Sequence, residues 1–173
     1  MAKVNKSLFA PVIVLVCICL VASFLLAGVY QITKPVIDER TEETKSAARK
    51  KVLPDGNSFV QVTDVELPEG VVDCFKADNG AGYVFSVENK GMEAGLKLMI
   101  GIDINSMISG ISVIEHNETA GIGTKVLADD NLAKFVGCTS EDKVDGVTGA
   151  TFTSKGVALG VSNAFAAYEL VTK

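Results

Sequence analysis

The segment Asp145-Gly-Val-Thr-Gly-Ala-Thr151, continued by Phe152-Thr-Ser-Lys-Gly156, combines small residues with a high density of hydroxyl groups. An Ala-, Val- and Leu-rich stretch follows it up to Val171, so the pattern predicts a loop that leads into a helix. The free amides and the dipole of a helix start suit a phosphate. Local chemistry alone leaves two interpretations open: a site for a phosphate-bearing cofactor at Thr151, or an ordinary helix N-terminus with threonine caps.

This segment lacks the spacing of two common motifs. It contains no G-x-x-x-x-G-K-[ST], so it is not a nucleotide-binding P-loop. Ser154-Lys155 does not form the S-x-x-K arrangement of serine acyltransferases. The segment therefore needs support from elsewhere in the chain.

A second dense patch is His116-Asn-Glu-Thr-Ala-Gly-Ile-Gly-Thr-Lys125. Gly121 and Gly123 permit positive φ and close approach of the backbone to a ligand. The side chains of Glu118 and Thr119 can hydrogen-bond a heterocycle, and Ile122 can lie against a ring face. An ordinary strand-to-helix loop with two glycines is the alternative interpretation.

The two patches resemble, in the same order, the motifs of the FMN-binding domain family. The first resembles D-x-x-[ST]-G-A-[TS], and the second resembles E-T-P-G-L-G with Ala120 in place of proline and Ile122 in place of leucine. The resemblance extends from Leu53 to Val171. It implies an FMN joined by a phosphoester bond to Thr151, with no metal and no catalytic side chain.

The resemblance also implies roles for individual residues. Asp145 is expected to be required for recognition by a flavin transferase, which uses FAD and Mg²⁺. The flavin pocket is expected to contain Thr148, Gly149, Ala150, Glu118, Thr119, Gly121, Ile122 and Gly123.

Members of the family that the chain most resembles are the G subunits of Rnf electron-transport complexes. Such a protein is expected to relay electrons in a complex that couples transfer between ferredoxin and NAD to Na⁺ or H⁺ movement. Its expected partners are the other subunits, the flavin transferase and membrane lipid. Two alternatives remain: the C subunit of a Na⁺-pumping NADH:quinone oxidoreductase, and an anchored binding module without a redox centre.

Residues 8–33 contain no charged side chain and are mostly Val, Ile, Leu and Phe. Because a bilayer core needs about 20 such residues, this run predicts a transmembrane helix. A cleaved signal peptide is less consistent with the run, since its apolar core is shorter, about 7–15 residues. Lys3 and Lys6 precede it, so the positive-inside rule predicts a short cytoplasmic segment at residues 1–7 and an extracytoplasmic domain.

The remaining chain predicts an α+β domain with a mostly antiparallel sheet. Residues 34–53 are polar and helix-favouring, which predicts a solvated stem that ends at Pro54. Residues 54–173 form the predicted FMN-binding domain. Its expected strands are Phe59–Val65, Val71–Lys76, Tyr83–Val87, Leu96–Ile104 and Met107–Glu115, and its expected helices are Asp130–Val136 and Thr153–Val171.

Composition excludes several functional classes. The 173-residue chain has a formal net charge of -5 and no basic run with interleaved aromatic residues, so nucleic acid is not an expected partner. A single histidine leaves little for His-rich metal sites. Cys17 and Cys19 lie in the apolar run, whereas Cys74 and Cys138 are either a disulfide pair or two free thiols.

Overall fold

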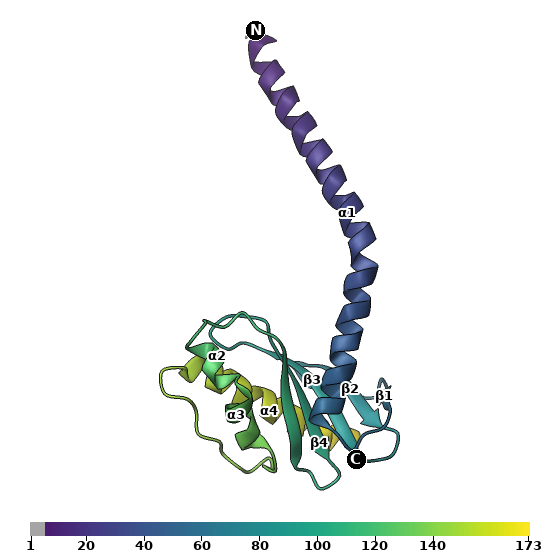
Figure 1. Cartoon of the computed structure of the whole chain (residues 1–173), viewed down its shortest axis with the longest axis vertical. Helices are drawn as coiled ribbons and strands as arrows, with labels where there is room; N and C mark the ends of the chain where they lie inside the picture. Colours follow the sequence, from purple (N-terminus) through teal and green to yellow (C-terminus); the bar gives the residue numbers. More distant parts are fainter. Residues whose placement is uncertain (1–5) are drawn as a thin grey trace. The chain divides into compact units, whose positions relative to one another are not determined.

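The computed structural model describes residues 6–173, so the predicted segment 1–7 lies outside it except for its last two residues. An N-terminal helix precedes a five-stranded antiparallel sheet with helices, which confirms the α+β prediction (Figure 1). The elements are α1 (Lys6–Val52), β1 (Phe59–Gln61), β2 (Val71–Ala77), β3 (Gly82–Asn89), β4 (Leu96–Asp103), β5 (Ile108–Glu115), α2 (Gly123–Val126), α3 (Asp129–Leu132), η1 (Ala133–Phe135) and α4 (Thr151–Val171).

Helix α1 continues through both the predicted transmembrane segment and the predicted stem. It contains Pro35, which lacks an amide hydrogen, yet the helix does not end there. Within the described residues, α1 is long and apolar enough to cross a membrane, and the side chains of its apolar stretch are exposed. The chain divides into two compact units, one up to Glu43 and one from Thr44 to Lys173.

The sheet of the second unit is a meander in which the strands pair in chain order. The central pairing is regular: Gly82 lies opposite Asp103, and Asn89 lies opposite Leu96. The predicted hairpin between β4 and β5 is present, and Ser106 adopts a φ of 59° in its turn. The carboxylate of Asp103 accepts hydrogen bonds from the amides of Asn105 and Met107, both at 2.9 Å, which stabilises this turn.

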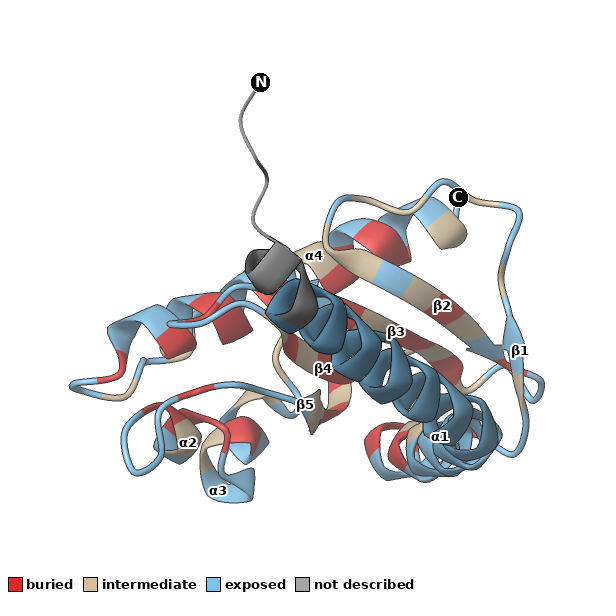
Figure 2. Cartoon of the chain, turned by 90° about the horizontal axis from the view of Figure 1, so that it is seen from above, coloured by how far each residue is buried: buried red, intermediate tan, exposed pale blue. Residues whose placement is uncertain are grey.

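Each face of the sheet is covered by helix, and successive strand residues alternate between the two cores. Phe85, Leu98 and Ile100 belong to the core shared with α4, whereas Val84 and Met99 belong to the core shared with the last turns of α1. Figure 2 shows buried segments in red on the strands and on α4. Strand β4 is therefore buried on both faces.

Two glycines of the sheet form the surface against which the end of α1 packs. Gly101 and Gly110 lie opposite each other on β4 and β5. A Cβ at Gly101 would collide with the carbonyl oxygen of Val52, and one at Gly110 would lie 2.9 Å from the Val52 Cα. The same carbonyl accepts a hydrogen bond from the Ser109 hydroxyl at 2.5 Å. The missing side chains thus allow the helix end to rest directly on the sheet.

The four cysteines are free thiols, which decides between the two interpretations of Cys74 and Cys138. Cys74 is fully buried in the core under α4, and this burial raises the pKa of its thiol to about 12. Cys138 is partly buried, and its Sγ lies 3.4 Å from the carbonyl oxygen of Lys134. Cys74 is therefore a core residue with very little thiolate at neutral pH.

We expect Gly101→Ala to lower the free energy of unfolding by about 1–3 kcal/mol, because its methyl group displaces the end of α1. Thermal unfolding of the full-length protein in detergent measures this change. Gly28→Ala is the matched control, since apart from its chain neighbours and the adjacent backbone of α1 no atom lies within 4 Å of the added methyl group. Equal unfolding temperatures for the two variants would contradict the close packing of the end of α1 on Gly101.

Candidate functional site

Thr151 is the first residue of α4, two residues before the predicted helix start. The N-cap is Ala150, and no side chain in the described chain caps this helix. The first amides of a helix lack acceptors within it, so those at the start of α4 are open to an external acceptor. The Thr151 side chain is exposed at this point.

The loop before α4 is held by Ser154. Its hydroxyl accepts a hydrogen bond from the Val147 amide at 3.1 Å and donates one to the Ala150 carbonyl at 3.0 Å. Gly149 has a φ of 85°, a conformation that side chains other than glycine rarely adopt. The Thr-Gly-Ala-Thr sequence therefore makes a tight turn that presents the Thr151 hydroxyl.

A small pocket of about 50 Å³ borders Thr151. Three segments contribute to it: the β3–β4 loop, the loop after β5, and the first turn of α4. Its lining residues are Met92, Glu118, Thr119, Ile122, Gly123, Gly149, Ala150, Thr151, Phe152 and Thr153. Met92, Ile122 and Phe152 are 52%, 52% and 65% exposed, so three large apolar side chains surround the pocket without being buried by the protein.

Glu118 lies beneath this pocket with only 7% of its surface exposed. Its carboxylate accepts a hydrogen bond from the Thr153 hydroxyl at 2.5 Å. The Met92 amide donates to both carboxylate oxygens, at 3.0 and 3.3 Å. A single side chain therefore contacts all three segments that line the pocket.

Two glycines make room for this carboxylate. A Cβ at Gly91 would collide with Oε1 of Glu118, and one at Gly123 would lie 2.8 Å from its Oε2. Gly123 is therefore a packing requirement of Glu118. Gly121, with a φ of 78°, serves the turn itself, and its amide donates to the Thr124 hydroxyl at 2.9 Å.

A second, open depression borders Thr151 on the side of the loop that precedes α4. Its lining includes Thr148, Gly149 and Lys155. Thr151 and Lys155 are separated by one helical turn and lie on the same face of α4. Asp145 is exposed in the preceding loop and lines a small cavity next to Val147 and Ser154.

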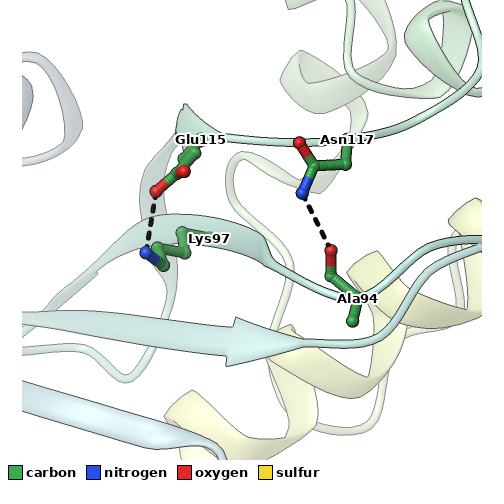
Figure 3. Close-up of polar contacts among 4 residues, drawn as sticks. All are labelled: Ala94, Lys97, Glu115 and Asn117. Carbon is green, nitrogen blue, oxygen red and sulfur yellow. Dashed lines mark hydrogen bonds and ion pairs between the residues drawn. The ribbon is translucent and has the colours of Figure 1, made fainter. Parts of the chain in front are cut away.

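The two loops beside the pocket are joined at their bases (Figure 3). The side-chain amide of Asn117 donates a hydrogen bond to the Ala94 carbonyl at 3.2 Å. The Lys97 ammonium pairs with the Glu115 carboxylate at 2.7 Å across β4 and β5. The hydrogen bond from Lys97 lowers the pKa of the Glu115 carboxyl. The Asn117 bond joins the two loops, whereas the Lys97–Glu115 pair is exposed and adds little to stability.

The structure brings together most of the residues predicted from the two motifs. Thr119, Ile122 and Gly123 line the same pocket as Gly149, Ala150 and Thr151, while Thr148 lies on the far side of Thr151. Sequence reasoning missed Met92, Phe152 and Thr153. The sequence contained two features that could have indicated Phe152 and Met92 as pocket residues: an apolar residue directly after Thr151, and a methionine in a loop bounded by glycines. His116 is exposed at the base of the loop.

Comparison with known proteins agrees with this geometry. Residues 91–166 match the FMN-binding domain family, a range that includes all three segments around the pocket. The chain is 31% identical over 166 residues to the G subunit of the ion-translocating oxidoreductase complex of Escherichia coli K12, covering 81% of each chain. It belongs to this family of G subunits.

Two further G subunits match across nearly the whole chain. The G subunit of the proton-translocating ferredoxin:NAD⁺ oxidoreductase complex of Clostridium ljungdahlii is 27% identical, over 94% of this chain and 92% of its own. The Na⁺-translocating counterpart of Acetobacterium woodii is 29% identical, over 97% and 95%. The match includes the region of α1, which supports a membrane-anchored protein.

The site of this family member has features that suit FMN. Exposed apolar side chains beside an uncapped helix start match a flat ring system that carries a phosphate. In the described residues, no three His, Cys, Asp or Glu side chains form a group that could hold a metal ion. The family match and the side chains present both support FMN as the cofactor.

We expect Thr153→Val to lower the free energy of unfolding by about 1–3 kcal/mol, because it leaves the buried Glu118 carboxylate without its hydroxyl donor. Thr151→Val makes the same chemical change two residues earlier, at an exposed position, and we expect a change within about 0.5 kcal/mol. Denaturant unfolding of the flavin-free protein compares the two. A Thr151→Val effect as large as that of Thr153→Val would contradict the assigned contacts.

Proposed function

We propose that this chain is the membrane-anchored G subunit of an Rnf-type complex and relays electrons through one FMN joined covalently to Thr151. The observation that carries the proposal is the position of Thr151. Its exposed hydroxyl lies at an uncapped helix start, next to three exposed apolar side chains, within the region that matches the FMN-binding domain.

The surroundings of Thr151 support a phosphoester at this residue. A phosphodiester carries a negative charge, which the free amides and the dipole at the start of α4 stabilise. Lys155 adds a cation one turn further along the same face of the helix. Thr148 and Gly149 form the turn that leads the chain past the phosphate.

The flavin ring is assigned to the pocket bordered by Met92, Ile122 and Phe152. A flat aromatic ring covers apolar side chains that are otherwise in contact with water, at a gain of about 25 cal/mol per Å² of apolar surface buried. Thr119, exposed in the adjacent loop, offers a hydroxyl to the polar edge of the ring. Gly121 allows the turn of this loop.

FMN, when attached, supplies electron transfer in steps of one or two electrons, and the protein supplies position and electrostatics. A threonine hydroxyl is a weak nucleophile without an activating base. We therefore assign the attachment to a separate flavin transferase, with Asp145 in the exposed loop as its recognition residue. The side chains around the pocket hold the ring and limit its contact with water.

The names of the relatives support the assignment of the complex and of its reaction. Their names describe ferredoxin:NAD⁺ oxidoreductases that translocate H⁺ in one organism and Na⁺ in another. We propose that this protein passes electrons between other subunits of such a complex, and that it contacts membrane lipid through α1. The match to G subunits favours this assignment over the C subunit of a quinone-reducing pump and over a binding module without a redox centre.

Thr151→Ala is expected to abolish FMN attachment. The full-length protein is produced together with a flavin transferase, and its intact mass and in-gel flavin fluorescence are measured. Wild type is expected to carry one FMN, while Thr151→Ala carries none because the hydroxyl is missing. Thr151→Ser retains a hydroxyl and is expected to be modified. An unmodified wild type, alongside an active transferase on a known substrate, would reject the proposal.

We also propose that the N-terminus is cytoplasmic and the flavin domain extracytoplasmic. In a chain with its native cysteines replaced by alanine, Ser140→Cys places a thiol at an exposed position. A membrane-impermeant maleimide is expected to label it in intact cells. A second cysteine introduced at Ala2 is expected to react only after the membrane is opened. The reverse pattern would place the domain in the cytoplasm.

A further inference from the structure

The buried carboxylate of Glu118 has a position that a direct flavin ligand does not require. It is 7% exposed, although charged side chains are seldom this buried unless their oxygens are satisfied. Here the oxygens face the Met92 amide and the Thr153 hydroxyl, both of which donate. Its hydrogen-bonding capacity is thus directed toward the protein.

The contacts of Glu118 connect segments that are far apart in the chain. Met92 precedes it by 26 residues and Thr153 follows it by 35. Met92 is one of the three exposed apolar side chains around the pocket, and Thr153 lies two residues after Thr151 in the first turn of α4. The carboxylate therefore fixes both the proposed ring contact at Met92 and the helix turn that carries the attachment residue.

Glu118 is packed closely against two glycines. Gly91 and Gly123 enclose it from the two loops, and a methyl group on either would overlap it. The neighbouring contact from Asn117 to the Ala94 carbonyl joins the same two loops a second time (Figure 3). Two bonds between the loops restrict their relative rotation, which one bond alone would permit.

We propose that Glu118 is a positioning residue: its carboxylate joins the β3–β4 loop, the loop after β5 and the first turn of α4, and so orients the flavin without bonding to it. This inference rests on the proposed function, because the group to be oriented is the FMN on Thr151. It assigns Glu118 a role different from the direct hydrogen bond to the heterocycle that its motif suggests.

The test measures visible-region circular dichroism of the attached flavin, which reports a fixed orientation in a chiral environment. Full-length Glu118→Ala and Thr153→Val, produced with a transferase, are expected to lose most of this signal per FMN below their unfolding temperatures. The double variant is expected to lose no more than Glu118→Ala alone, since that change already removes the bond to Thr153. Intact mass gives the FMN content of each sample.

Conservative variants separate positioning from direct contact. Glu118→Gln keeps the side-chain length, offers an oxygen to the Met92 amide, and donates its NH₂ to the Thr153 hydroxyl. It is expected to retain the wild-type signal, as is Thr153→Ser, which keeps the hydroxyl. Glu115→Ala is the matched control, because it removes an exposed carboxylate three residues earlier on the same segment.

The possible outcomes distinguish this inference from the function on which it rests. Wild-type protein without FMN would reject the proposed function, and the positioning role with it. Modified wild type with an unchanged signal in Glu118→Ala would reject the positioning role alone. A Glu118→Gln variant that loses the signal as fully as Glu118→Ala would also overturn it, because the carboxylate would then be needed for more than its internal hydrogen bonds.

Discussion

The fold depends on one strand that is buried on both faces. Leu98 and Ile100 of β4 pack under α4, while Met99 and Gly101 of the same strand face the last turns of α1. Each helix needs the sheet between them in order to bury its apolar side, and the sheet needs both helices to exclude water from its two faces. The glycines at 101 and 110 complete this arrangement, because the end of α1 lies against the strand backbone. The candidate site is built on this layered core.

The meander explains why residues from distant parts of the sequence converge at the site. Because the strands pair antiparallel, the end of β3, the start of β4 and the end of β5 lie at the same end of the sheet, as the pairs Asn89–Leu96 and Lys97–Glu115 show. The loops that carry Met92 and Glu118 therefore emerge side by side. Helix α4 packs on β3 and β4 and brings Thr153 to the same end of the sheet. The topology places the three segments together, and the Glu118 carboxylate then fixes their spacing.

Much of this arrangement was predictable from local patterns, since alternating apolar residues and turn residues mark β2 to β5 and the two motifs mark the loops. β1 ends at Gln61 instead of Val65: after the bond from the Val62 amide to the Cys74 carbonyl, the chain continues through Asp64 and Glu66, residue types that are depleted in strands. The contact between Glu118 and Thr153 was not predictable, because it depends on the packing of α4 against a loop 35 residues away. The helix start at Thr151 was missed for a related reason: threonine favours the cap position by propensity, but the tight turn at Gly149 places Ala150 there.

The size of the pocket bears on why a covalent bond suits this site. Pockets that retain small ligands by contact alone are concave and measure about 300–1,000 Å³. The pocket lined by Met92, Ile122 and Phe152 has about 50 Å³, and these three side chains remain more than half exposed around it. The depression on the other side of Thr151 is larger, about 480 Å³, but it is open to solvent. Such a site covers only part of a flavin, so contacts alone give weak binding. A bond to Thr151 removes the need for an enclosing cavity, because the attached ring remains at a high local concentration even when its contacts are few.

An open site also leaves part of the ring uncovered, which allows a redox partner to approach closely. The shallow pocket and the proposed phosphoester thus support the same function, in which a retained flavin exchanges electrons with neighbouring subunits.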